Sequence, residues 1–546
     1  MRRRPRSGIR LSPALVLVTS AFFAGNAIAL APDVETLPCD VAGVLAAPVT
    51  APAGPKLADG LFLVGANRTR LTPSPTLFGG TFWQTSGCFE VDQANPDLTH
   101  TLPSPGHGWP FTPPDCIYLG GFGIGPARAA RAEGPGGIWV RSLAVSNGAA
   151  TFVYSIIDAT GYFYRYQGGA CADCGIHDMR AALSTAFGVP VENLVIGATH
   201  SHSAPDGYGG WGGLPPWYWS QIRDSVIASQ KQAVANLEPA TLQIGLGLVR
   251  QLNGQRRDFY YSTPDYTAGW LQAKRTDGSV IATLANYAAH PTIVNGNGGF
   301  PVLHADWPGA AARHFEALYG GVGLLFEGGL GNMSVARLDG DGETGSAENT
   351  GIAFADAIAR NIAIEPHPLT TNEMETNVVV IQHPVMTNQG LAVLGTLGLF
   401  SREFLPTGPG AAGPGAYHWT KSPGGPGELR SCVSVAPIQI QAVVGAHRIG
   451  RLGIAFAPGE IFSNISTVLK SERKQNDALL VFGQTNDSLG YIMQSFEYDY
   501  KGGGPLAAVT QYGTMTGEYE EVFNLDHCLG DHVLQQLLDS TAALGL

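Results

Sequence analysis

Two histidines one residue apart follow a short apolar segment in the middle of the chain. Residues 194–198 read Leu-Val-Ile-Gly-Ala and lead into Thr199-His200-Ser201-His202. We expect a buried strand here, and loops at strand ends carry much of the chemistry of α/β proteins. Alternate residues of an extended segment point the same way, so both imidazoles could face one pocket. One histidine could then hold a metal while the other handles protons, although a surface loop with two histidines is the alternative.

Two further predicted strands end in residues that could take part in catalysis. The strand predicted at 281–289 ends at His290, where a lone histidine is often structural. The strand predicted at 322–326 runs into a glycine-rich turn that contains Ser334. Free backbone N–H groups in such a turn could bind an oxyanion. The turn lacks the Gly-x-Ser-x-Gly pattern, so it does not indicate a serine triad.

A carboxylate and a phenol near the C-terminal end of the chain complete the set of candidates. Glu460 follows Pro458-Gly459 and is expected at the mouth of a helix over 460–472. A negative charge at a helix N-terminus is also simply stabilising, which is the alternative explanation for Glu460. Tyr491 lies beyond Gly483-Gln484-Thr485-Asn486, in a segment with several tyrosines.

The elements that must position these residues alternate between strand and helix patterns. This alternation predicts an α/β fold of layered mixed β-sheets flanked by helices, loop-rich and forming a single large domain. Strands are predicted at 61–66, 138–145, 151–158, 194–198, 241–249, 281–289, 322–326, 437–446, 448–457 and 478–483, and helices at 176–187, 217–237, 305–318, 351–364 and 460–472. The Pro- and Gly-rich segments 71–137 and 406–427 are predicted to be surface loops or insertions around an entrance.

Composition and the N-terminal residues bound the possible roles. The chain has 546 residues, 44% of them hydrophobic and only 14% charged, which is ample for a large core. Residues 1–29 combine five arginines, an apolar run and Ala27-Ile28-Ala29, which predicts a secretory signal peptide rather than a transmembrane anchor. We therefore expect a secreted or periplasmic protein, with a Pro/Ala-rich leader at 30–56 and the domain at 57–546. Loss of those arginines would take the net charge from −12 to −17, which argues against nucleic acid as a partner.

Seven cysteines follow the predicted signal peptide. In an exported protein most of them are expected to form disulfides, with one left over. Cys171 and Cys174 have the spacing of a zinc knuckle, but no second such pair occurs in the sequence. A local disulfide between them is the favoured interpretation.

Taken together and in order, these motifs resemble the neutral/alkaline (non-lysosomal) ceramidase family. The family carries Thr-His-Thr-His-[Ser/Ala]-Gly-Pro-Gly-Gly, and residues 199–207 match it with Ala204 and Asp206 in place of two glycines. The later motifs that also match, from about residue 57 to the C-terminal end, are His290-Pro291, His304-Ala305-Asp306-Trp307-Pro308-Gly309, Gly331-Asn332-Met333-Ser334, Pro458-Gly459-Glu460, the segment 483–491 and Tyr519-Glu520.

The resemblance implies a zinc-dependent amidase with one Zn²⁺ per chain. Its substrate would be ceramide or a related N-acyl lipid, which it could meet at a membrane surface. By this resemblance the zinc ligands are His200, His290, Glu460 and Tyr491. The catalytic positions are Ser334, His202, Arg256 and Tyr519, with Arg257 as the alternative to Arg256.

Departures from the family pattern concern the substrate pocket more than the metal. Ala204 and Asp206 are expected at the mouth of the site, and we expect a member that lacks the C-terminal immunoglobulin-like domain of the family's bacterial proteins. A zinc hydrolase of a non-sphingolipid N-acyl amide or ester remains an alternative, as does a non-catalytic lipid- or carbohydrate-binding relative. A metallo-β-lactamase-type site would need Asp at position 204, which is Ala, and an amidohydrolase barrel would carry its histidine pair near the N-terminus.

Overall fold

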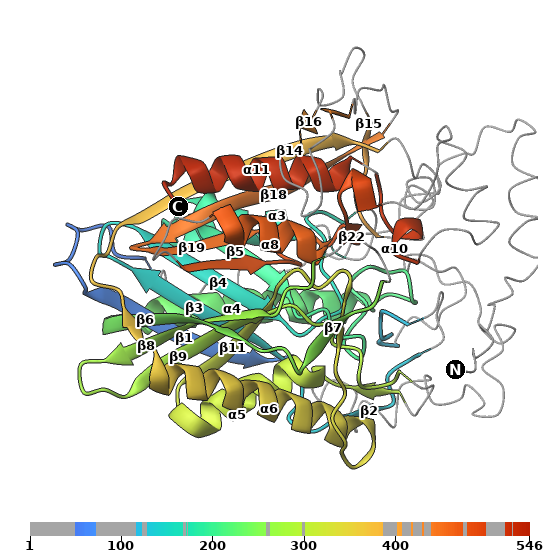
Figure 1. The fold of residues 1–546 in the computed structure, drawn as a ribbon, viewed down its shortest axis with the longest axis horizontal. Coiled ribbons are helices and arrows are strands. Elements are labelled where there is room, and N and C mark those ends of the chain that lie inside the picture. Colours follow the sequence, from blue (N-terminus) through green and yellow to red (C-terminus); the bar gives the residue numbers. More distant parts are fainter. Residues whose placement is uncertain are drawn as a thin grey trace, which may run out of the picture. The chain divides into compact units, whose positions relative to one another are not determined.

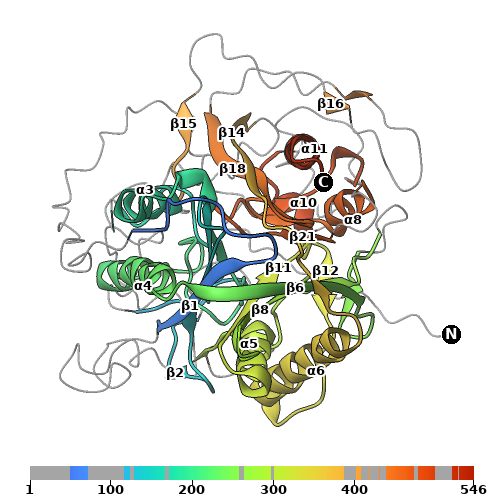
Figure 2. The same cartoon turned by 90° about the vertical axis from the view of Figure 1, so that its left-hand side faces the viewer.

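The computed structural model describes one compact α/β unit within Leu37–Leu546. Two β-sheets lie face to face, with helices on their outer sides (Figures 1 and 2). The described residues are 50–71, 116–122, 128–166, 171, 173–257, 263–296, 301–385, 401–406, 417–418, 429–430, 438–472, 478–497, 519–526 and 528–546.

The larger sheet has nine strands and is mixed. Its order is β11-β9-β8-β6-β1-β3-β4-β5, with β13 beside β6. The centre is antiparallel, whereas β4 with β5 and β9 with β11 form parallel pairs near the two edges. The strands are β1 (Phe62–Arg70), β3 (Trp139–Ser146), β4 (Thr151–Ile157), β5 (Leu194–Ala198), β6 (Glu238–Leu248), β8 (Thr267–Arg275), β9 (Val280–Tyr287), β11 (Val322–Glu327) and β13 (His367–Pro368).

The smaller sheet packs on one face of the larger one. It consists of β14 (Met374–Pro384), β18 (Ile438–Ile449), β19 (Leu452–Phe456) and β21 (Ala478–Phe482), with β15 (Leu405–Pro406) beside β18. A shared apolar core lies between the sheets, in which the rings of Phe326 and Phe482 stack with centroids 4.2 Å apart. Strands buried on both faces read as continuous apolar runs, which is why β5 and β21 show no alternation in the sequence.

Helices cover the outer faces of both sheets and complete a four-layer arrangement (Figure 2). On the larger sheet these are α3 (Ile176–Phe187), α4 (Pro216–Ala235), α5 (Asp306–Tyr319) and α6 (Gly342–Ile364), and on the smaller sheet α8 (Ser463–Glu472) and α11 (Leu529–Ala543). The layered α/β prediction is therefore confirmed. None of the helices in the described part of the chain is both long and apolar enough to cross a bilayer.

The main differences from the predicted elements are at boundaries and in omissions. The helix predicted from residue 460 begins at Ser463, and Glu460 belongs to the short strand β20 (Glu460–Ile461). Helix α6 begins at Gly342 rather than at 351. Strands β8 and β14 and helix α11 were not predicted. The predicted loops at 71–137 and 406–427 fall largely outside the described residues, although 132–133 form a two-residue strand, β2, that pairs with β10 (Val302–Leu303).

The local disulfide predicted from the Cys-x-x-Cys spacing is present. Cys171 and Cys174 are bonded to each other, which removes them as zinc ligands. Cys116 and Cys528 are also disulfide-bonded. The expectation that this chain uses its cysteines for disulfides is therefore met at all four of these described positions.

Candidate metal centre

The ends of strands from both sheets meet at one place and bring the candidate residues together. His200 follows β5, His290 follows β9, Glu460 follows β19, and Tyr491 lies in the segment after β21. The loops after β5 and β9 meet through the backbone, since His202 N–H donates to the carbonyl oxygen of Pro291 at 3.0 Å. The two sheets are tied together at this place as well, since Ala198 N–H donates to the carbonyl oxygen of Gln484 at 2.9 Å.

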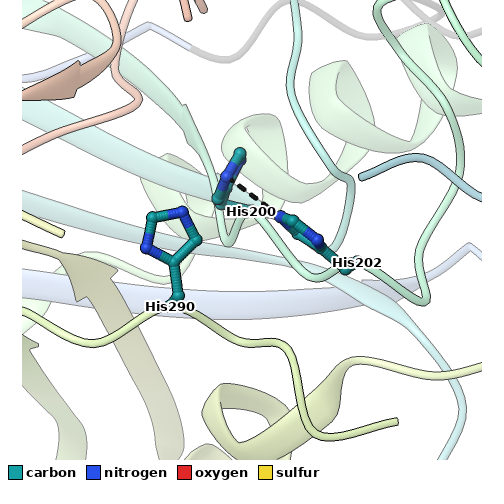
Figure 3. A group of neighbouring side chains, drawn as sticks. All are labelled: His200, His202 and His290. Atoms are coloured by element: carbon teal, nitrogen blue, oxygen red, sulfur yellow. Dashed lines mark hydrogen bonds between the residues drawn. The ribbon is translucent and has the colours of Figure 1, made fainter. Parts of the chain in front are cut away.

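The two neighbouring histidines do face each other, but not for the reason predicted. His200 has a φ of 60°, so the segment turns in the left-handed region instead of continuing as an extended strand. The turn places Nε2 of His202 3.3 Å from Nε2 of His200 (Figure 3). The ring of His290 lies 5.2 Å from that of His200 and 5.8 Å from that of His202. Backbone strain of this kind is typical of functional sites.

Backbone carbonyls fix which ring nitrogen of each candidate ligand is free. Nδ1 of His200 lies 2.6 Å from the carbonyl oxygen of Thr160, and Nδ1 of His290 lies 2.7 Å from that of Leu330. A carbonyl can only accept, so both Nδ1 atoms carry the proton. The lone pair of each Nε2 is then available to a metal, as in the histidine ligands of zinc proteins.

A carboxylate oxygen joins the two free nitrogens at distances that suit zinc. Oε2 of Glu460 lies 3.3 Å from Nε2 of His200 and 3.1 Å from Nε2 of His290. Ligands bound tetrahedrally to zinc at about 2.0–2.1 Å are separated from each other by about 3.3 Å. The donor set and its spacing therefore fit a zinc ion held by His200, His290 and Glu460. Nε2 of His202 lies 3.3 Å from Nε2 of His200, the same distance as Oε2 of Glu460. His202 is therefore either a further metal ligand or a catalytic group next to the metal.

The protonation states suit metal binding at neutral pH. Burial alone would raise the pKa of Glu460, but the facing His200 and His290 outweigh burial and hold that pKa well below its ordinary value. Burial, and then the charge of Arg256, lower the pKa of His290 to about 4. Burial also lowers the pKa of His202, followed by the neighbouring histidines. Glu460 as a carboxylate and His290 as a neutral imidazole are the forms in which these side chains ligate metals.

Tyr491 lies next to Glu460, and Arg256 reaches its hydroxyl. Strand β20 pairs in parallel with β22 (Tyr491–Ile492), with Glu460 opposite Tyr491, so the two side chains share one face. Nη2 of Arg256 donates to the Tyr491 hydroxyl at 2.8 Å, and Nε donates to Glu520 at 2.7 Å. A guanidinium at this distance would offset the negative charge of a tyrosinate bound to a metal.

The structure separates the two adjacent arginines that the sequence left as alternatives. Arg256 follows β7 (Asn253–Gln255) and points to Tyr491, whereas Arg257 pairs with Glu521 at 2.9 Å. Tyr519 is the first residue of α10 (Tyr519–Val522) and precedes Glu520, the partner of Arg256. Of the two arginines, Arg256 is the one in contact with a candidate ligand.

Ser334 lies beside the backbone of His290, but its turn differs from the prediction. It belongs to β12 (Met333–Val335), which pairs with β7, and it forms a bridge with His290. The predicted free N–H groups of the turn are largely used: Gly331 donates to Ile461 at 3.0 Å and Met333 to Leu330 at 2.8 Å. An oxyanion hole made by this glycine turn is therefore not supported.

A pocket opens from the candidate ligands, and six of its fifteen lining residues are Phe, Tyr or Trp. It contains about 710 Å³ of atom-free space, part of which is open solvent at its mouth. Its lining residues are Gly121, Phe163, His200, His202, Tyr208, Trp211, Arg402, Phe404, Glu460, Ser488, Leu489, Gly490, Tyr491, Phe523 and Leu525. The aromatic wall was missed from the sequence, although Tyr-Gly-Gly-Trp-Gly-Gly directly after the histidine motif was a usable signal.

The prediction that Ala204 and Asp206 lie at the mouth of the pocket was wrong. Both residues are fully buried, and neither lines the pocket. The Asp206 carboxylate accepts four backbone N–H groups, including those of Tyr208 at 3.1 Å and Trp211 at 2.7 Å. Burial raises the pKa of Asp206 to about 6, although these N–H groups act in the opposite direction. Asp206 therefore shapes the loop that carries two wall residues.

Comparisons with known proteins agree with this architecture. No protein-family model matches the sequence, and no curated protein matches it. The structure is similar to that of neutral ceramidase from Pseudomonas aeruginosa, with a TM-score of 0.60 and 16% identity over 89% of this chain and 75% of that chain. It is also similar to a ceramidase complexed with C2, with a TM-score of 0.58 and 16% identity over 89% of this chain and 76% of that one. The chain therefore has the fold of the neutral ceramidases.

Proposed function

We propose that the protein is a zinc-dependent amidase that hydrolyses the N-acyl amide bond of ceramide or a related N-acyl lipid. The observation that carries this proposal is the convergence of His200, His290 and Glu460, at spacings suited to zinc, beside an aromatic pocket. The likeness to neutral ceramidase structures supports the same reaction class.

His200, His290, Glu460 and Tyr491 would hold the zinc ion. When bound, zinc supplies Lewis-acid chemistry, polarising the amide carbonyl and making water a nucleophile at neutral pH. The carbonyls of Thr160 and Leu330 keep the two imidazoles oriented for this role. The Arg256 guanidinium offsets the negative charge of the Tyr491 oxygen.

His202 is proposed to move the proton that the reaction requires. Burial lowers its pKa, so the ring is neutral at pH 7 and has a lone pair for the proton that the attacking water or Ser334 hydroxyl gives up. It would deliver that proton to the leaving amine, since amide nitrogen leaves poorly until it is protonated. The ring is held in place by the edge of Phe122, whose centroid lies 4.9 Å away.

Three other residues are proposed to act on the reacting carbonyl. Arg256 and Tyr519 would stabilise the developing oxyanion. Ser334 would either attack the carbonyl directly or position the water that does so. Its place beside the backbone of His290 is compatible with both roles.

The pocket and the disulfides support a lipid substrate met outside the cell. Walls such as Phe163, Trp211 and Phe404 suit an acyl chain, because they offer large apolar surface. Disulfides such as Cys171–Cys174 form in oxidising compartments, which agrees with the proposed signal peptide at 1–29 and with secretion or periplasmic location. In this proposal the leader at 30–56 precedes a catalytic domain at 57–546.

The proposal is tested by incubating the purified protein with fluorescent ceramides of several chain lengths and with simple N-acyl amides, with and without a chelator. Chelator-sensitive release of the fatty acid from ceramide is the expected result. Cleavage of another N-acyl compound but not of ceramide would refute ceramide as the substrate, whereas the proposed amidase activity would be supported. Zinc and lipid binding without any hydrolysis would indicate a non-catalytic relative.

A further inference from the structure

Gln484 lies between the loops that carry two of the proposed zinc ligands. Its backbone carbonyl accepts the N–H of Ala198 at 2.9 Å, and its own N–H donates to the carbonyl of Gly459 at 3.0 Å. These partners stand two residues before His200 and one before Glu460. Gln484 is 1% exposed and has a φ of 52°, a conformation that costs free energy for any residue with a side chain. The backbone here is thus held in an unfavourable conformation at the junction of both ligand loops.

The side chain of Gln484 reaches from the proposed metal ligand to the pocket wall. Its terminal amide nitrogen lies 3.2 Å from Nδ1 of His200 and 3.2 Å from the hydroxyl of Tyr208. The other terminal atom of the amide has no hydrogen-bond partner in the part of the chain that the structure describes. The contacts to His200 and Tyr208 are therefore what hold this buried amide in place.

The chemistry of Nδ1 decides which end of the amide faces it. Thr160 can only accept through its carbonyl oxygen, 2.6 Å from Nδ1, so Nδ1 is a donor. A 180° rotation exchanges the nitrogen and oxygen of a glutamine amide, and oxygen is the atom that complements Nδ1–H. In that orientation the Tyr208 hydroxyl donates to the same oxygen, so one acceptor serves the ligand and the wall.

We infer that Gln484 is a positioning residue: its amide oxygen shares the Nδ1–H of His200 with the Thr160 carbonyl, helps to keep that ring turned toward the metal, and ties it to Tyr208 in the pocket wall. This inference rests on the proposed zinc site. Partners of this kind behind a ligating histidine set its orientation and basicity, and their loss typically weakens metal binding about 10- to 100-fold. Because Tyr208 and His200 share the Gln484 oxygen, a displacement of Tyr208 in the pocket wall would also shift the His200 ring.

The test is the zinc dissociation constant of the full-length protein, measured by competition with a chromogenic chelator. Gln484→Leu removes the acceptor at similar size and is expected to bind zinc about 10- to 100-fold more weakly. Gln484→Glu keeps an acceptor oxygen and is expected to stay within about threefold of the wild type, because a carboxylate is a common partner of ligating histidines. Gln484→Asn tolerates the left-handed backbone but is too short to reach His200, so it should behave like Gln484→Leu even if that variant folds poorly.

Gln272→Leu is the matched control. Gln272 is also a fully buried glutamine, on β8, whose amide donates to Thr283 at 3.1 Å. Its loss should lower the melting temperature without changing zinc affinity. The inference would be overturned if Gln484→Leu and Gln484→Asn bound zinc as tightly as the wild type. It would also be overturned if Gln272→Leu lost as much zinc affinity as they do. Neither result would affect the proposed function. A wild-type protein that binds no zinc would instead overturn the proposed function, and the inference with it.

Discussion

Replacing Arg256 by Met tests how the charge network behind Tyr491 works. The substitution keeps an apolar stem but removes the guanidinium that lies 2.7 Å from Glu520 and 2.8 Å from the Tyr491 hydroxyl. Breaking a buried ion pair costs about 3–5 kcal/mol, because one charge stays buried without its partner. The Glu520 side chain is 4% exposed but that of Arg256 is 24% exposed, so water can enter. We therefore expect a loss of about 1–3 kcal/mol in the free energy of unfolding.

Arg257→Met is the matched control from the next position in the chain. The Arg257 side chain is 2% exposed, pairs with the fully buried Glu521 at 2.9 Å and lies 3.9 Å from Glu520, but it makes no hydrogen bond to Tyr491 among the described contacts. Its replacement should cost at least as much stability, about 3–5 kcal/mol. Zinc affinity should nevertheless stay close to that of the wild type in any Arg257→Met protein that folds.

Denaturant unfolding and zinc competition on both variants separate the two effects. Arg256→Met should bind zinc about 10- to 100-fold more weakly and lose about 10²-fold in amide hydrolysis. If both variants lose zinc affinity equally, the loss follows stability and not the contact with Tyr491. If Arg256→Met binds zinc normally, Arg256 does not support the Tyr491 oxygen and the reasoning is wrong.

Three other perturbations give distinct outcomes. His202→Ala should keep its zinc yet lose about 10²- to 10⁴-fold in rate, whereas His200→Ala should lose both; metal analysis showing the reverse would exchange their roles. The carboxylate of Asp206 takes up a proton as the pH falls through about 6. The oxygen that carries this proton can no longer accept hydrogen bonds freely from the backbone N–H groups that face it. Steady-state kinetics should therefore show KM rising between pH 7 and 5, and Asp206→Asn should have a high KM at every pH; a flat wild-type profile would contradict this. Trp211→Ala should raise KM about 10-fold for long acyl chains and little for short ones, and an equal effect on both would remove Trp211 from the acyl-binding wall.

Much of the layered fold follows from local patterns in the sequence. Helix α3 and strand β5 have the predicted bounds, because amphipathic spacing and a buried apolar run are strong signals. Strand β14 was missed, since its polar ends and its central valines give no regular alternation. The start of α6 was also missed, because Gly342, Gly345 and polar residues weaken the helix pattern there.

The candidate ligands could be found from the sequence, but their support could not. Motifs such as Thr-His-Ser-His are local, whereas Gln484 is 284 residues from the His200 ring that it contacts. The left-handed turn at His200 is likewise set by tertiary contacts, and it replaced the extended geometry that the spacing indicated. The turn before Ser334 looked open because glycines leave N–H groups free, but Ile461 and Leu330 accept them.

The central claim is that one zinc ion, held by His200, His290, Glu460 and Tyr491, is required for amide hydrolysis. The most direct measurement is hydrolysis of an N-acyl amide by metal-free protein as zinc is added back, with bound zinc counted in the same samples. Activity should rise in proportion to bound zinc and level off at one per chain, and His290→Ala should show neither tight binding nor activity. Full activity in protein that contains no metal would contradict the account.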